Sequence, residues 1–166
     1  MIRSCCVRTL LPVLLALALC CARAEAQDED AWRFGLSAGG TSTLALVFER
    51  MEGRKGLELT VGTWSFRNLS VSGVLKAYLG PSAFRPALGA GLWTVVGLRP
   101  QEGERGGVAV LARFPIGFDW RFLDDHYLDL DISVNRALWV RRADFSDLPP
   151  SPRLVPIPGL SYRITP

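Results

Sequence analysis

The sequence predicts an all-β protein, an eight-stranded antiparallel up-and-down transmembrane β-barrel preceded by a signal peptide. Between Val108 and Phe122 every second residue is apolar, while Arg113 and Asp119 stand on the other face. At ~3.3 Å per residue this stretch could reach roughly 50 Å, whereas a usual strand has about 5–6 residues. Gly and Pro recur every 10–15 residues along the chain, the segments between them alternate, and no convincing amphipathic helix is found. An apolar leader precedes these segments.

The leader, residues 1–26, is predicted to be a signal peptide, and residues 27–166 an outer-membrane β-barrel domain. Arg3 and Arg8 form its basic region, Thr9–Ala22 is an apolar segment of 14 residues, and Ala24–Ala26 offers a cleavage site with small residues. The alternative is a transmembrane helix, which would need ~20 apolar residues. Cleavage after Ala24 is also possible, and the bulky residue before Cys20 disfavours lipid attachment there.

The composition of the leader changes what the mature chain can be. All four cysteines lie in the leader, so the predicted mature chain has no disulfide and no Cys-based metal or redox site. The leader also holds three arginines and one glutamate, so the mature chain keeps 16 basic and 15 acidic residues, a net charge of +1 rather than +3. This charge gives no support to nucleic-acid binding. With 140 residues remaining, one domain is expected.

The first four predicted strands each place apolar residues at alternate positions. The fourth shows the pattern most clearly, because Ser70, Ser72 and Lys76 stand between its apolar residues. The strands are expected at residues 31–39 (Trp32, Phe34, Leu36 and Ala38 apolar), 42–50 (Leu44, Leu46 and Phe48), 57–66 (Leu57, Leu59 and Val61) and 69–79 (Leu69, Val71, Leu75 and Leu79).

The last four strands repeat the pattern and are longer. Small or charged residues occupy the other face of each, such as Gly89 and Gly91 in the fifth and Asp129 and Asp131 in the seventh. The strands are expected at residues 84–96 (Phe84, Leu88, Ala90 and Leu92 apolar), 108–122, 127–140 (Leu128, Leu130, Ile132 and Val134) and 153–164 (Leu154, Leu160, Tyr162 and Ile164).

Loop lengths predict how the barrel is oriented. The connections Gly97–Gly107 and Arg141–Pro152 are the two longest, while the connection around Leu123–His126 is tight. Outer-membrane barrels have long outer loops and short periplasmic turns. With a periplasmic N-terminus, both long connections lie outside. The short first and third connections make this agreement partial.

Aromatic residues are expected to mark the two membrane interfaces, where amphipathic rings are favourable. At the rim opposite the periplasmic one, the interface aromatics would be Trp64, Phe66, Trp93 and Trp139. These four share parity with the polar face, so either bulges intervene or their rings fill the mouth of the lumen. The periplasmic girdle is predicted from the interface aromatics Trp32, Phe84, Trp120, Phe122 and Tyr162, together with Phe34, Phe48 and Tyr127.

The polar face is expected to fill a narrow lumen with paired charges, since eight strands leave room only for side chains. Arg121 and Asp129 can face the lumen as cross-strand partners only if the numbers of paired residues have an even sum. This predicts a three- or five-residue turn centred near Asp125, with Arg121 opposite Asp129 and Asp119 opposite Asp131. The predicted ion network consists of Arg113, Asp119, Arg121, Asp129 and Asp131, with Glu58, Lys76 and Arg85 on the same face.

Catalysis is the less favoured interpretation of these charges. Paired carboxylates can do acid–base chemistry, but arginine-rich packing keeps them ionised and a filled lumen gives a substrate no access. His126 follows Asp124 and Asp125, residue types that commonly form solvated turns. The mature chain has no nucleophile-elbow, phosphate-loop, zinc-protease or calcium-loop motif. We assign no catalytic, cofactor-binding or metal-binding residue.

Three segments resemble small outer-membrane β-barrels of the OmpA/OmpX-like group, namely FRPALGAGLW (Phe84–Trp93), RFPIGFDWRF (Arg113–Phe122) and PGLSYRI (Pro158–Ile164). The resemblance implies a monomeric protein of the outer membrane that contacts its lipid and lipopolysaccharide and is inserted by the barrel-assembly machinery. Arg141 and Arg142 could touch lipopolysaccharide phosphates or form a solvated loop pair. Such barrels commonly end in an aromatic residue, whereas this chain ends Ile164-Thr165-Pro166.

The predicted function is therefore that of an integral outer-membrane protein of a Gram-negative envelope, with a structural or surface-interaction role and no catalytic activity. The alternative is a soluble secreted barrel of lipocalin-like shape that binds a hydrophobic ligand. A soluble barrel would need a hydrophilic exterior. In the segment 85–95, the residues that alternate with the apolar positions are too small and apolar to form one. A lipid-modifying outer-membrane enzyme is a third possibility and would need a reactive Ser or His at the outer rim.

Overall fold

The computed structural model describes residues 30–98, 106–142 and 153–166. The predicted signal peptide lies outside the described residues, as does most of the two long connections. The described residues contain no helix that is long and apolar enough to cross a membrane.

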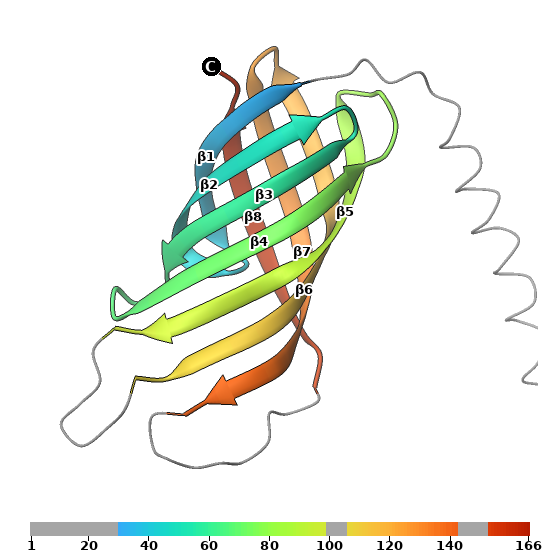
Figure 1. The fold of residues 1–166 in the computed structure, drawn as a ribbon. Helices are drawn as coiled ribbons and strands as arrows, with labels where there is room; N and C mark the ends of the chain where they lie inside the picture. The colour runs from blue at the N-terminus through green and yellow to red at the C-terminus, as the bar shows by residue number, and fades with distance from the viewer. Residues whose placement is uncertain (1–29, 99–105, 143–152) are drawn as a thin grey trace, which may run out of the picture.

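Eight antiparallel strands form a closed barrel in sequence order, which confirms the predicted all-β barrel and its strand count. Each strand pairs with the next, and β1 pairs with β8 to close the sheet (Figure 1). The strands are β1 (Ala31–Gly39), β2 (Ser42–Glu52), β3 (Lys55–Thr63), β4 (Asn68–Tyr78), β5 (Phe84–Gly97), β6 (Val108–Leu123), β7 (His126–Arg141) and β8 (Val155–Ile164).

The barrel has two distinct ends. We call the end at which β1 begins and β8 finishes the terminal end, and Figure 1 shows the C-terminus there beside the start of β1. The turns between β2 and β3, β4 and β5, and β6 and β7 also lie at this end. The opposite end, here the loop end, holds the β1–β2 turn, the β3–β4 connection and the two long connections.

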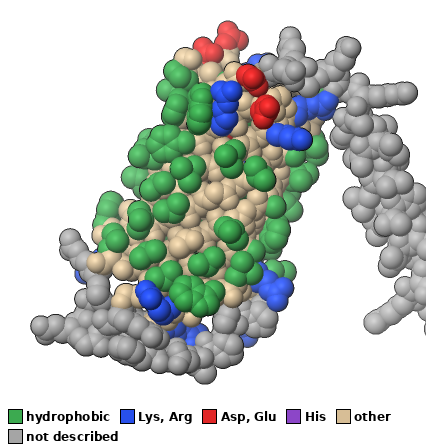
Figure 2. All heavy atoms as spheres, viewed as in Figure 1, with side chains coloured by type: hydrophobic (Ala, Val, Ile, Leu, Met, Phe, Trp, Pro, Cys, Tyr) green, Lys and Arg blue, Asp and Glu red, His purple; other side chains and the backbone are tan. Residues whose placement is uncertain are grey.

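The strand faces divide sharply into an apolar outside and a polar inside. Outward residues such as Leu36 and Leu75 are 52% and 67% exposed, whereas inward Arg33 and Glu49 are fully buried. Figure 2 shows apolar side chains over the visible wall, with charged side chains gathered toward the two ends. Charged side chains are thus buried in the lumen and large apolar side chains are exposed on the wall, which is the opposite of the usual distribution.

The register of the β6–β7 hairpin corrects the predicted charge pairs. Asp119 lies opposite Asp129, and Arg121 lies opposite Tyr127. The predicted Arg121–Asp129 and Asp119–Asp131 pairs are therefore wrong, as is the three- or five-residue turn. The strands are joined at the Leu123–His126 pair, and a register shift between Arg121 and Leu123 absorbs one extra residue. A bulge of this kind inserts one extra residue in one strand, so the pairs beyond it are offset from those that simple alternation predicts.

The four aromatic residues expected at the loop end occupy different places in the structure. Trp93 points into the lumen, where it is buried and its Nε1–H donates to Ser70 Oγ at 2.8 Å. Trp139 is half exposed, because a register shift between Val110 and Leu111 moves it to the outer face. Trp64 and Phe66 lie beyond the end of β3, in the connection to β4. Both explanations considered for these residues, a bulge and a filled mouth, thus apply, but to different ones.

The last strand closes the barrel despite its prolines. Pro156 and Pro158 pair with β7, while β1 pairs with β8 from Gly159 to Ile164. The carbonyl of Pro158 accepts a hydrogen bond from Gly40 N–H at 2.7 Å. Both prolines therefore lie in the part of β8 that pairs only with β7, before the ladder between β8 and β1 starts.

Candidate functional site: the ion network of the lumen

Arg163 of β8 lies at the centre of the buried charges. Its Nη1 is 2.6 Å from Glu49 Oε2, and its Nη2 is 3.0 Å from Glu58 Oε2 and 2.8 Å from Asp129 Oδ2. Nη1 also donates to the hydroxyl of Tyr78 at 3.1 Å, and that hydroxyl donates in turn to Glu49. Arg163 is fully buried, so these contacts lie inside the barrel. Its one guanidinium group thus contacts three carboxylates from three other strands.

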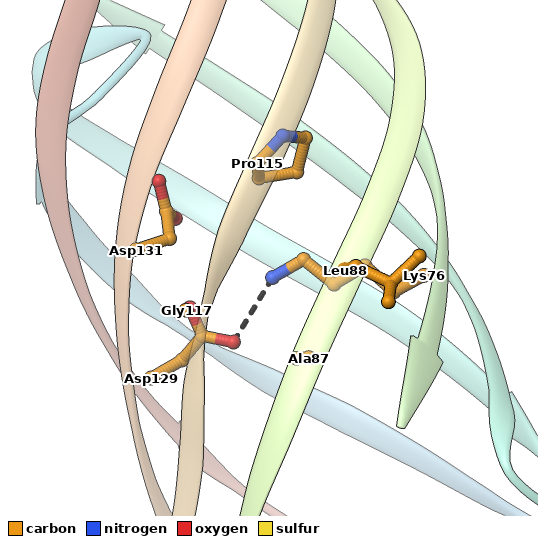
Figure 3. A pocket seen from close by; sticks show the side chains of 7 residues that line it. All are labelled: Lys76, Ala87, Leu88, Pro115, Gly117, Asp129 and Asp131. Atoms are coloured by element: carbon orange, nitrogen blue, oxygen red, sulfur yellow. Dashed lines mark hydrogen bonds and ion pairs between the residues drawn. The ribbon is translucent and has the colours of Figure 1, made fainter. Parts of the chain in front are cut away.

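Lys76 of β4 provides the second centre of positive charge. Its Nζ lies 2.7 Å from Glu58 Oε2 and 3.0 Å from Asp129 Oδ2. Figure 3 shows the Lys76 side chain extending toward the carboxylate of Asp129 in β7. The void lined by Lys76, Asp129 and Asp131 leaves no room for a water molecule. Gly117 lines the same void, and Gly89 pairs with Lys76 in the neighbouring strand.

Asp119 of β6 forms ion pairs with two further arginines toward the terminal end of the barrel. Arg85 Nε lies 2.9 Å from Asp119 Oδ2, and Arg33 Nη1 lies 3.5 Å from the same oxygen. The guanidinium of Arg33 also stacks over the ring of Tyr127, at 3.7 Å from the ring centroid. The facing carboxylates of Asp119 and Asp129 thus have different cations, Arg33 and Arg85 on the first and Lys76 and Arg163 on the second.

Arg113 lies between the charged part of the lumen and a part nearer the loop end that is lined by small polar side chains. It donates to Ser133 Oγ at 2.7 Å and to Ser72 Oγ at 3.1 Å, with Asp131 at 3.7 Å. Nearer the loop end, buried side chains are mainly hydroxyls and one amide. This group includes Ser37, Thr41, Ser42, Thr60, Ser70, Ser72, Ser133 and Asn135.

The structure places four of the five predicted network residues inside the barrel. Arg113, Asp119, Asp129 and Asp131 are buried, whereas Arg121 is exposed at the mouth of the terminal end. There Arg121 lines a small recess with Arg85 and Tyr127. Arg121 is the third residue from the end of β6 and lies opposite Tyr127, two residues nearer the turn than the predicted partner Asp129.

Three charged residues at the heart of the network were not among the predicted lumen charges. They are Arg33, Glu49 and Arg163, all fully buried. The alternating pattern of the strands could have identified these residues as inward, because each has an outward apolar or aromatic neighbour in the sequence. Arg163, for example, stands between Tyr162 and Ile164. With them the described interior ion pairs join five cations to five carboxylates, namely Arg33, Lys76, Arg85, Arg113 and Arg163 with Glu49, Glu58, Asp119, Asp129 and Asp131.

The predicted interface aromatics form an exposed band at the terminal end. Trp120 and Phe122 lie 5.7 Å apart between ring centroids, and Phe122 lies 6.4 Å from Tyr162. Trp32 stacks on Phe34 at 6.3 Å. The five rings that we assigned to this interface are between 40% and 52% exposed, namely Trp32, Phe84, Trp120, Phe122 and Tyr162.

Two residues at the terminal end differ from the expected arrangement. Tyr127 was expected in the aromatic girdle but is buried in the lumen under Arg33, because its position in β7 has inward parity. His126 lies outside, where its Nδ1 is 2.6 Å from the hydroxyl of Tyr162. The described residues contain no group of His, Cys, Asp and Glu arranged to hold a metal ion.

The fold and its interior define a class of structure, a closed eight-stranded barrel whose lumen is filled by ion pairs. Comparisons with family models, curated proteins and solved structures find no match.

Proposed function

We propose that this protein is an integral outer-membrane β-barrel with a structural or surface-interaction role and no catalytic activity. The observation that carries the proposal is the inverted distribution of side chains. Large apolar residues on every strand point outward, while ten charged side chains are paired inside. Soluble monomers rarely expose a contiguous apolar patch larger than a few hundred Å². Hydrocarbon solvates such a wall at no cost.

The backbone is also compatible with a bilayer. Hydrocarbon cannot bond to free N–H and C=O groups, so only helices and closed barrels cross it. This sheet has no open edge, because β1 pairs with β8. The strands have 9 to 16 residues, against the ~9–11 that a tilted strand needs to cross. The exposed rings at the terminal end would then lie at the membrane interface.

The filled lumen supports a role without catalysis. Its carboxylates are engaged by arginine and lysine, and the void beside Asp129 admits no water. The contacts of the protein would then be made on its outer wall and its two long connections. The partners that fit this role are outer-membrane lipid, lipopolysaccharide and the assembly machinery, with the protein acting as a monomer.

Cell fractionation and gel mobility test the proposal. We expect the mature chain to stay with the outer membrane after osmotic shock, and to migrate faster on a gel when unheated than when boiled. Release by osmotic shock without detergent would overturn the membrane proposal in favour of a soluble barrel. Hydrolysis or transfer of lipid acyl chains by the purified protein would instead favour a lipid-modifying enzyme.

A further inference from the structure

The outer wall carries a groove among its exposed apolar side chains. It runs across β3, β4, β5 and β6, which lie side by side in Figure 1, and has a volume of about 480 Å³. This lies within the roughly 300–1,000 Å³ of small-molecule sites. Its lining consists of Lys55, Leu75, Lys76, Ala77, Leu88, Gly89, Ala90 and Phe114.

Small residues set among large ones create the groove. Ala77 pairs with Leu88, and Leu75 pairs with Ala90, so each small residue stands beside a leucine on the neighbouring strand. Lys76 and Gly89 contribute only their backbone, because the Lys76 side chain is paired in the lumen and glycine has none. The groove is therefore a built depression with an alanine and backbone floor and walls of leucine and phenylalanine.

The sheet pairing is interrupted beside this groove. The β5–β6 pairs stop at Leu88–Ile116 and resume at Gly91–Arg113. Pro115 lies in the gap and has no N–H to donate to a neighbouring strand. An apolar occupant of the groove would cover this weak point of the wall.

We propose that this groove binds one acyl chain of an anionic phospholipid, with the lipid phosphate on Lys55. The inference rests on the proposed membrane insertion. Lys55 is exposed at the terminal end, while Phe114 lies near the middle of β6, so the groove runs from the rim toward the centre of the wall. A lipid has the same polarity, with its charge at the interface and its chain below. Arg54 and Lys55 outnumber Glu52 at this turn, which favours a phosphate there.

A second copy of the chain fits the groove less well than a lipid. Stable protein interfaces use about 20–30 residues on each side. The groove has eight lining residues, two of which offer only backbone. Its narrow apolar floor and single cation match one flexible chain with one anionic head.

Photolabelling of the full chain in vesicles tests the site. The probe is phosphatidylglycerol with a diazirine on one acyl chain, present as a minor fraction in phosphatidylethanolamine vesicles. We expect cross-links to concentrate on the outward residues of the groove, at Leu75, Ala77, Leu88 and Ala90. Lys55→Gln should lower this labelling by about five-fold, the equivalent of one cation near an anionic surface.

Matched variants separate occupancy of the groove from general contact with lipid. Ala90→Leu fills the floor and should abolish the concentration of labels, while Ala38→Leu adds the same side chain to the outer face of β1 and should leave it unchanged. Flotation with the vesicles and the heat-dependent gel shift report insertion for each variant.

Each outcome distinguishes this inference from the proposed function. Even labelling around all eight strands, in chains that float and shift on heating, would overturn the lipid site and leave the membrane proposal standing. Cross-links between two copies of the chain at the groove would overturn it in favour of a dimer. Failure of the wild-type chain to float would overturn both.

Discussion

At the scale of single residues, the ion network explains how a barrel with a charged core can be stable. Five cations and five carboxylates balance inside the lumen, and the strongest contacts converge on Arg163. A buried pair gains little over an apolar core, but removing one partner leaves an uncompensated charge and costs about 3–5 kcal/mol. The most damaging substitutions should therefore be those that remove one member of the network.

Arg163→Gln should destabilise the folded barrel by about 3–5 kcal/mol, because Glu49, Glu58 and Asp129 lose their shared cation. The midpoint of urea unfolding, followed by the gel shift of unheated samples, measures this loss. Arg141→Gln removes the same charge from an exposed position and should change stability by less than about 0.5 kcal/mol. Equal effects of the two variants would contradict the central role of Arg163.

Arg121→Ala should have a much smaller effect, although the sequence alone made it the partner of Asp129. Arg121 is exposed at the mouth, and Asp129 is held by Lys76 and Arg163. An exposed charge contributes about 0–1 kcal/mol. The same unfolding assay checks this value, and a loss comparable to that of Arg163→Gln would restore the register predicted from the sequence.

At the scale of elements, glycines decide how closely neighbouring strands pack. A Cβ placed on Gly91 would lie 2.0 Å from the carbonyl oxygen of Gly73, whereas a Cβ on Gly73 would meet nothing within 4 Å. Gly35 and Gly117 are as crowded as Gly91, against the backbone of β8 and β7 respectively. Glycine in a strand commonly marks such a close approach of backbone, as in the bends of a small barrel.

Gly91→Ala should therefore destabilise the barrel by about 1–3 kcal/mol, since the β4 and β5 backbones must separate to admit the methyl group. Gly73→Ala is the matched control on the paired strand. It should be neutral or stabilising by about 0.5–1 kcal/mol, because alanine loses less conformational entropy than glycine. Unfolding midpoints of the two variants measured side by side would test the packing, and a Gly73→Ala loss as large as that of Gly91→Ala would refute it.

At the scale of the whole molecule, the apolar outer face and the polar lumen are the basis of the proposed membrane insertion. Figure 2 shows an apolar wall between charged ends, and the lumen carries the polar groups. In the proposed orientation the wall meets lipid, and the cost of an outward charge depends on its depth. In water that cost would not depend on position along the barrel.

Ile132→Arg should cost about 2–4 kcal/mol in vesicles, because Ile132 is exposed on the outer face near the middle of β7. Leu123→Arg, at the terminal end of β6, should cost only about 0–1 kcal/mol. Refolding yield into vesicles and urea midpoints measure the difference. Equal tolerance of the two arginines would argue for an aqueous exterior and against the membrane proposal.

The sequence by itself determined the strand count, the approximate strand bounds and the face that most side chains of the strands occupy. These follow from a period of two residues and from Gly and Pro between strands, which are local properties of the chain. It also identified most of the lumen charges and the exposed aromatic band. The first strand, Ala31–Gly39, matches its predicted range.

Only the tertiary structure decided which charges meet. A two-residue turn and one bulged residue in the β6–β7 hairpin set Asp119, rather than Arg121, opposite Asp129. Closure of the barrel then brought Arg163 to Glu49, 114 residues away in the chain. Alternation fixes the face of a residue but not its height or its neighbours across the lumen. Those depend on bulges and on the stagger of the closed sheet, which no local pattern encodes.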